Sequence, residues 1–174
     1  MVHIRSEKET DDTALYNLHC LAFGGEGEAR LVQNLRRGGF FAHAMSVVAE
    51  EDGGVIGHAL FSDITLTGPG GSVKTAALAP VSVLPERQNQ GIGSQMVRAG
   101  LRAIAEAGYQ CALVLGEPKY YSRFGFDVQP AEGIQSSYAG PYFMAWEIEP
   151  GILRTKPGLT AVYSPPFQLL EDAA

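Results

Sequence analysis

The fold is decided by Val81-Ser-Val-Leu-Pro-Glu-Arg-Gln-Asn-Gln-Gly-Ile-Gly-Ser94, a stretch that joins a buried strand to a helix. The apolar run Leu78 to Leu84 predicts the strand, and the pattern from Ser94 to Ala107 predicts the helix. A strand that passes through a glycine turn into a helix leaves the first helical N–H groups unpaired. These donors and the positive end of the helix dipole favour an anion, and Gly91 and Gly93 allow a pyrophosphate to approach the backbone.

The composition indicates one ordered domain over residues 1–174. Hydrophobic residues make up 45% of the chain and charged residues 18%, which excludes a disordered chain. The net charge of −6 argues against a nucleic-acid partner, because such proteins normally carry a basic stripe. An acidic surface suits a basic or amine-bearing partner.

Cysteine usage and hydropathy favour a cytoplasmic protein. Only two cysteines occur, Cys20 and Cys111, so no disulfide framework is predicted. Both lie in apolar patterns typical of small core residues, not of nucleophiles. No signal peptide and no apolar run of membrane-spanning length is visible, and no residue cluster has metal-ligand spacing, so we expect neither a membrane anchor nor a metal.

The order of the predicted elements places the chain in the α/β (α+β) class. Strands are expected at 3–5, 44–50, 55–65, 73–84, 112–115, 143–148 and 159–163. Helices are expected after a cap at Asp11 or Thr13, and over 28–37, 94–107 and 118–123. The first helix would have its apolar positions at Leu15, Leu18, Leu21 and Ala22, and Asp52-Gly53-Gly54 would form a tight hairpin turn. The expected architecture is a mostly antiparallel sheet with one parallel crossover at the glycine loop.

Other phosphate-binding motifs do not fit the loop. A dinucleotide fingerprint requires a further glycine where Met96 stands, and a P-loop requires Gly-Lys-Ser/Thr. A glycine pair alone is also compatible with a plain turn. However, Gln88-x-x-Gly91-x-Gly93 resembles the acyl-coenzyme A pyrophosphate loop of the GNAT superfamily of N-acetyltransferases. Tyr120-Tyr-Ser-Arg-Phe-Gly-Phe126 resembles the Tyr-x-x-x-Gly-Phe motif of the same superfamily.

The resemblance implies a GNAT-like fold with about four helices and acetyl-coenzyme A as co-substrate. It places backbone groups of Val81 and Val83 on the pantetheine arm. The full set of cofactor-binding residues that we expect is Val81, Val83, Gln88, Gln90, Gly91, Gly93 and Ser94. One departure from the superfamily pattern is Gly116-Glu117-Pro118, where many members carry an Asn, so contacts of that Asn are not transferred.

Three residues are candidates for the chemistry. Tyr121 matches the superfamily tyrosine that serves the leaving sulfur, and an ordinary phenol is protonated at neutral pH, as a proton donor must be. Glu117 and His58 are candidate general bases for the attacking amine. The alternatives are a core tyrosine, a solvated loop carboxylate, a hydrogen-bonded sheet histidine, and a reaction with water or no dedicated base.

The predicted function is acetyl transfer to a primary amine of a small molecule or peptide through direct ternary-complex attack. Phe23 to Glu28 and Ser136 to Tyr142 would shape the acceptor pocket, by resemblance to the superfamily. Two other classes remain open at this point: a non-catalytic acyl-coenzyme A sensor or partner-binding module, and a nucleotide-binding regulatory domain. The sequence leaves the acceptor and a homodimeric state open.

Overall fold

The computed structural model describes residues 1–172, and its contacts group the chain into two compact units. The first unit contains residues 1–62, 79–103 and the segment from residue 164 onward. The second contains residues 63–78 and 104–163. Two long strands, β3 (Gly54–Gly68) and β5 (Thr75–Val83), begin in one unit and end in the other.

The first unit is built on the strand order β1-β2-β3-β5. β1 (His3–Ser6) pairs antiparallel with β2 (Ser46–Glu51), and β2 pairs antiparallel with β3. The predicted hairpin turn is confirmed, because Asp52 and Gly53 both adopt positive φ angles, of 51° and 80°. Such angles are the signature of the tight turns that match strand twist.

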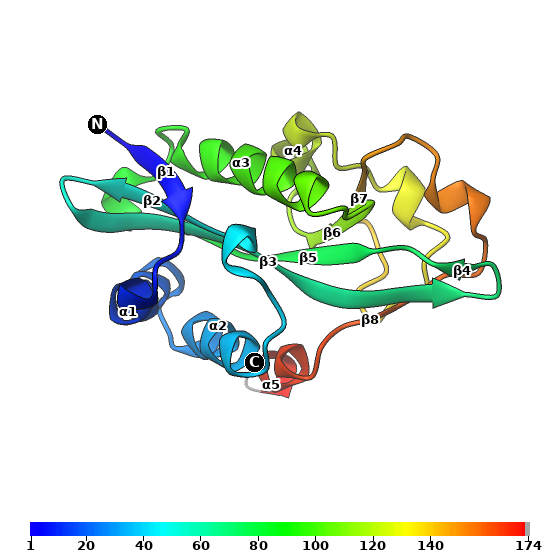
Figure 1. Cartoon of the computed structure of the whole chain (residues 1–174), viewed down its shortest axis with the longest axis horizontal. Coiled ribbons are helices and arrows are strands. Elements are labelled where there is room, and N and C mark those ends of the chain that lie inside the picture. The colour runs from blue at the N-terminus through cyan, green and yellow to red at the C-terminus, as the bar shows by residue number, and fades with distance from the viewer. Residues whose placement is uncertain (173–174) are drawn as a thin grey trace. The chain divides into compact units, whose positions relative to one another are not determined.

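Helices cover both faces of these strands (Figure 1). α1 (Asp12–Phe23), α2 (Gly27–Arg37) and α5 (Pro166–Asp172) lie on one side, and α3 (Ile92–Glu106) lies on the other. Leu15 and Leu18 of α1 pack against Val48 of β2. α3 lies so close to β3 that a Cβ atom on Gly100 would come within 2.1 Å of the Phe61 ring.

Helix α1 departs in two details from the expected helix. Leu21 is 63% exposed, because residues 15, 18 and 21 advance three at a time and drift away from a helical stripe of 3.6 residues per turn. Asp11 occupies the N-cap position, as one of the two expected caps, but it makes no side-chain capping bond: its carboxylate accepts hydrogen bonds from the Lys8 N–H and from Arg5. Helix α5 was not predicted, since seven residues are too few for a clear periodic pattern.

The second unit contains the parallel crossover. β5 runs parallel to β6 (Cys111–Leu115), and β6 pairs antiparallel with β7 (Phe143–Glu147). β4 (Gly71–Ser72) and β8 (Thr160–Val162) pair antiparallel with the end of β3. The predicted mostly antiparallel sheet with one parallel pair is therefore confirmed.

A separate apolar core stabilises the second unit. Its buried residues are Leu66, Val73, Cys111, Leu113, Ala131, Ile134, Phe143, Ala145, Leu153, Leu159 and Ala161. The expected helix over 118–123 is divided: α4 (Pro118–Tyr121) is followed by a 3-10 turn over Ser122–Phe124. Gly125 ends this turn with a φ of 93°, a conformation that favours glycine.

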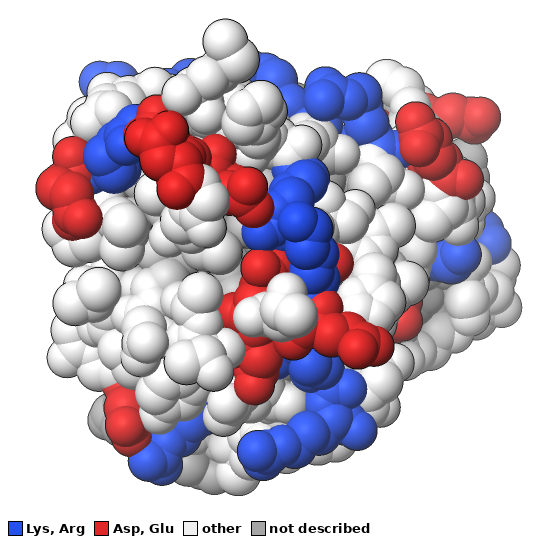
Figure 2. Space-filling view, turned by 60° about the vertical axis from the view of Figure 1, so that its left-hand side comes forward, with Lys and Arg blue, Asp and Glu red and all other residues white. Residues whose placement is uncertain are grey.

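Charged side chains of both signs lie beside one another on the face drawn in Figure 2. In the first unit, Arg5 pairs with Asp11 and Glu50, and Arg87 pairs with Glu51. This face is therefore not uniformly acidic, because basic side chains lie among its acidic ones (Figure 2). None of the helices within residues 1–172 has the length and apolar character that a membrane crossing requires.

Candidate active site

The glycine loop forms the start of α3, in the first unit. After a 3-10 turn over Pro85–Arg87 the chain turns sharply, and α3 begins at Ile92, two residues before the predicted start. Gly93 and Ser94 therefore lie in the first helical turn. The first intrahelical bond runs from the Gln95 N–H to the Gly91 carbonyl at 3.1 Å, so the N–H groups of residues 92–94 have no intrahelical partner. This is the geometry of an anion site at a helix N-terminus.

Two residues in the left-handed region shape the loop. Gly91 has a φ of 80°, and a Cβ atom there would meet no other atom within 4 Å, so the space in front of it is open. Asn89 has a φ of 60°. The sequence reasoning did not include Asn89, although asparagine is one of the few residues that tolerate this conformation. Successive backbone N–H groups in such a turn form a concave site that suits a phosphate.

The two predicted cofactor glutamines hold the backbone of their own loop. Gln88 donates from Nε2 to the Val83 carbonyl at 3.2 Å. Gln90 donates to the Glu86 carbonyl at 3.3 Å and accepts from Arg87 Nε at 3.2 Å. Their side chains are exposed, and their contact with a cofactor stays a prediction.

Val81 and Val83 lie in the last part of β5, also in the first unit. Within the described residues, the register of β5 with β6 covers only Thr75–Ala77, although β5 continues to Val83. Backbone groups of this last part are therefore not engaged in the parallel ladder. The Val83 carbonyl accepts from Gln88 Nε2, and the assignment of Val81 and Val83 to the pantetheine arm stays a prediction.

Glu117 and Tyr121 lie together in the second unit, directly after β6. Glu117 is the N-cap residue of α4, where its carboxylate accepts from the Lys119 N–H at 3.5 Å. The Tyr121 N–H donates to the Glu117 carbonyl at 3.1 Å. The Glu117 side chain is exposed and Tyr121 is half-buried.

The environment of Tyr121 keeps its phenol protonated. The ring lies against the backbone of Gly116, where a Cβ atom would come within 2.4 Å of it, and packs edge-on against Tyr120 and Phe126. Burial, with a smaller contribution from Tyr120, raises the pKa of Tyr121 to about 12. No hydrogen bond of the Tyr121 hydroxyl is found within residues 1–172, so the proton is not committed to another acceptor.

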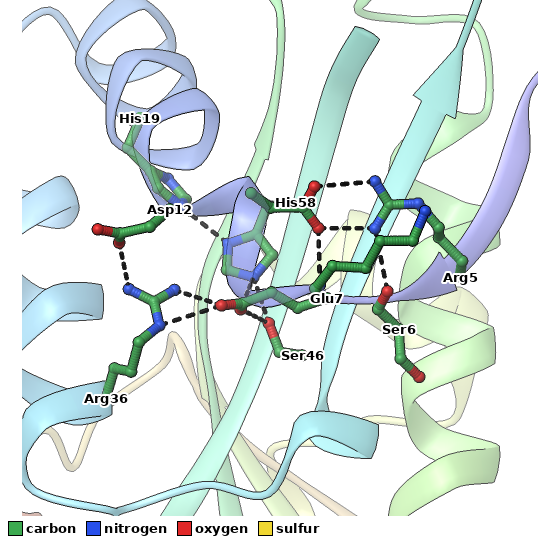
Figure 3. Close-up of polar contacts among 10 residues, drawn as sticks. Arg5, Ser6, Glu7, Asp12, His19, Arg36, Ser46 and His58 are labelled. Carbon is green, nitrogen blue, oxygen red and sulfur yellow. Dashed lines mark hydrogen bonds and ion pairs between the residues drawn. The ribbon is translucent and has the colours of Figure 1, made fainter. Parts of the chain in front are cut away.

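His58 has the environment of the alternative given above, a hydrogen-bonded sheet histidine, and not that of an accessible base. It is fully buried in β3 and belongs to a row of hydrogen-bonded side chains that we call the buried polar chain: Glu7, Ser46, His58 and His19 (Figure 3). His58 Nδ1 lies 2.9 Å from His19 Nε2, and His58 Nε2 lies 2.7 Å from Ser46 Oγ. Ser46 Oγ also bonds to Glu7.

This geometry does not favour His58 as a direct base. Both ring nitrogens are already engaged, and burial, followed by the charges of His19 and Arg36, lowers the pKa of His58 well below its usual value. An acceptor amine reaches His58 only if the buried polar chain is taken apart. The other members of the chain were missed, because no local pattern links residues so far apart in the sequence.

The cysteines are placed as expected for unreactive residues. Cys111 is buried at the start of β6, and burial raises the pKa of its thiol to about 12, so the thiolate is scarce at neutral pH. Cys20 is partly buried on α1. Over the described part of the chain, no group of three His, Cys, Asp or Glu side chains is arranged to hold a metal ion.

Comparison with known proteins gives a consistent result. Residues 3–129 match the family described as "Acetyltransferase (GNAT) domain". The chain is 34% identical over 140 residues to "Uncharacterized N-acetyltransferase YjhQ" of Escherichia coli K12, an alignment that covers 80% of this chain and 75% of YjhQ. It is 32% identical over 137 residues to "Uncharacterized N-acetyltransferase YhbS" of the same strain, covering 79% of this chain and 80% of YhbS.

Two solved structures are similar over nearly the whole chain. The crystal structure of YhbS from Escherichia coli in complex with CoA has a TM-score of 0.85 and 30% identity, covering 96% of this chain and 92% of that one. A GNAT family acetyltransferase from Brucella melitensis in complex with acetyl-CoA has a TM-score of 0.76 and 31% identity, covering 96% and 98%.

Proposed function

The chain belongs to the GNAT family of acetyltransferases, and from this premise we propose that it transfers an acetyl group from acetyl-coenzyme A to a primary amine. The observation that carries the proposal is the loop in front of α3. Asn89 and Gly91 adopt left-handed conformations, the space beside Gly91 is open, and the helix behind them makes its first intrahelical bond only at Gln95. A pyrophosphate fits this arrangement, and the similar Escherichia coli and Brucella structures are complexes with CoA and acetyl-CoA.

In the proposed reaction the neutral amine attacks the thioester carbonyl within a ternary complex. A backbone N–H of Val81 or Val83 polarises that carbonyl, and Tyr121 donates a proton to the leaving thiolate. Glu117 is the proposed acceptor of the amine proton, directly or through water, because its exposed carboxylate precedes Tyr121 on the same turn. We propose no covalent intermediate, since Cys111 is buried and protonated.

The proposed acceptor class rests on the chemistry of acetyl transfer, and the surface around Glu117 is compatible with it. Leu115 and Tyr142 are 52% and 55% exposed, and the Gly116 N–H bonds to the Tyr142 carbonyl at 3.0 Å, so apolar surface borders the carboxylate. An amine of a small molecule or of a peptide satisfies both features. The proposal also includes a cytoplasmic location, which fluorescence imaging tests. It includes one domain over residues 1–174, which limited proteolysis tests, and a homodimer, which light scattering tests.

Calorimetry and thiol release test the function together. We expect saturable binding of acetyl-coenzyme A, and thiol release with at least one class among polyamines, aminoglycosides, amino acids and peptides. If neither acetyl-coenzyme A nor coenzyme A binds at about 1 mM, the cofactor assignment is wrong. Binding without thiol release over the whole panel would instead support the non-catalytic sensor.

Replacing Gly91 with valine should weaken cofactor binding more than tenfold, which corresponds to about 1.4 kcal/mol. The branched side chain would occupy the open space that phosphate oxygens need, and it would oppose the φ of 80°. Gly53→Val is the matched control, because Gly53 also has a φ of 80° and open space but lies in the β2–β3 hairpin. Equal cofactor affinity in the Gly91 and Gly53 variants would show that the loop is only a turn.

A further inference from the structure

The buried polar chain connects helix α1 with strands β2 and β3 and with the end of β1 in the first unit. Glu7 follows β1, Ser46 lies on β2, His58 on β3 and His19 on α1 (Figure 3). Arg36 of α2 extends the connection, because it donates to Glu7 at 2.5 and 3.0 Å and to Asp12, the first residue of α1, at 2.6 Å. Helix α1 is thus held at its first residue by Asp12 and in its second half by His19.

The hydrogen positions along the buried polar chain follow from the donor and acceptor groups of its members. The Glu7 carboxylate accepts from the Arg36 guanidinium, so it is ionised and must also accept the Ser46 hydroxyl proton. Ser46 Oγ then accepts from His58 Nε2–H, and His58 Nδ1 accepts from His19 Nε2–H. Both imidazoles are neutral, and His19 Nδ1 is left with a lone pair. That atom is indeed buried and has no hydrogen-bond partner within residues 1–172.

An added proton has no good position in this arrangement. A proton on His19 creates an N–H at Nδ1, where the described residues offer no acceptor. A proton on His58 Nδ1 would place two N–H groups opposite each other, because His19 Nε2 already carries a hydrogen. If His19 changed its tautomer to avoid this, its hydrogen would move to Nδ1, where there is again no acceptor. A buried N–H without an acceptor costs more than a buried lone pair. Only the neutral pair is compatible with the closed packing.

We propose that the buried polar chain is a pH-sensitive clasp, which holds α1 and α2 on strands β1 to β3 at neutral pH and opens when its two histidines take up protons. The proposal does not depend on acetyl transfer. It explains why two fully buried histidines, a serine and a carboxylate are placed between helices and strands that otherwise pack through apolar residues such as Leu15, Leu18 and Val48.

The charges around the histidines set the direction of the effect. Glu7 faces them from the end of β1, Arg36 from α2 and Asp12 from the start of α1, and the Arg5, Asp11 and Glu50 cluster lies on the strand side. Burial, and then Arg36, lowers the pKa of His19 to about 4, and burial also lowers that of His58. An open, solvated histidine has its usual pKa near 6.5. The clasp is therefore fully stable above about pH 6.5 and weakens as the pH falls toward about 4.

Two measurements on the natural chain test the clasp. Long-range nitrogen–proton NMR at pH 7 should show hydrogen on Nε2 of both His19 and His58 and none on Nδ1. Hydrogen exchange, corrected for intrinsic rates, should show the opening equilibrium of α1 and α2 amides rising about 600-fold from pH 7 to pH 5, because each histidine that opening exposes contributes about 25-fold over this range. Amides of α3 within residues 92–103 are the internal reference and should change less than tenfold.

A matched pair of variants identifies the groups responsible. His19→Gln keeps an N–H donor toward His58 but cannot titrate, so the pH response of α1 and α2 should fall by about 25-fold. His43→Gln removes an exposed histidine that does not belong to the buried polar chain. The exchange of its α1 and α2 amides should respond to pH as in the natural protein. A hydrogen on His19 Nδ1 at pH 7, an equal response in α3, or an unchanged response in His19→Gln would each overturn the proposal. The NMR measurement decides the matter even if His19→Gln fails to fold.

Discussion

Tyr121→Phe should lower kcat and kcat/KM together by about 10²-fold while the affinity for coenzyme A stays nearly unchanged. The substitution removes one hydroxyl and keeps the ring, which packs against Gly116, Tyr120 and Phe126. A proton donated only in the transition state contributes to both constants equally. Stopped-flow thiol release and calorimetry on the same preparation measure the two quantities.

Tyr120→Phe is the matched control for this prediction. It removes the neighbouring hydroxyl, while the Tyr120 ring keeps its contacts with Phe124 and with the Arg123 guanidinium, which lies 4.6 Å from the ring centre. We expect its activity to stay within about threefold of the natural chain. If Tyr121→Phe is equally active, Tyr121 is a packing residue. Glu117→Gln tests the proposed base separately, because it should remove the acidic limb of the pH–rate profile without changing cofactor affinity.

Glu7→Ala should destabilise the protein by about 1–3 kcal/mol, the cost of leaving the buried Ser46 hydroxyl without its acceptor and of removing one partner of the partly exposed Arg36. The Glu7 carboxylate is only 2% exposed and receives hydrogen bonds from Arg36 and Ser46. Without it, the guanidinium is left beside a cavity and the Ser46 hydroxyl loses its acceptor. The midpoint of urea unfolding at pH 7 should fall with little change in the slope of the transition.

Glu9→Ala supplies the control, since Glu9 is exposed two residues away, and should change stability by less than about 0.5 kcal/mol. Glu7→Gln keeps an acceptor for Ser46 but removes the charge, so it separates loss of the ion pair from loss of the hydrogen bond. An effect of Glu7→Ala as small as that of Glu9→Ala would mean that the buried polar chain contributes little to stability. It would also remove the structural basis of the clasp.

Local chemistry explains what could be predicted from the sequence. The hairpin at Asp52-Gly53 and the glycine loop depend on backbone conformations that a few neighbouring residues decide. The amphipathic helix after Gly93 shows an apolar period of 3.6 residues, and the strand 112–115 is a continuous apolar run. Both signals are visible within one short window of sequence. Family motifs added the cofactor, because the loop and the tyrosine turn occur in a fixed order.

The errors arose where periodicity alone does not decide the environment. Leu21 looks like its neighbours Leu15 and Leu18 but lies 63% exposed, because three-residue steps leave the buried stripe. Helix α5 has seven residues, and its stability depends on packing against α2 instead of on its own pattern.

The sequence by itself determined the strand-to-helix loop and the order of elements, since these depend on interactions between residues close together along the chain. It also determined the family, because two short motifs identify it. Only the tertiary structure decided the environment of His58. Its partner His19 is 39 residues away, and Glu7 and Ser46 are also 39 residues apart. Whether a histidine is a solvated base or a buried, neutral link depends on which side chains the packing brings within hydrogen-bonding distance. The packing of α1 and α2 on β2 and β3 therefore determines the protonation state of His58.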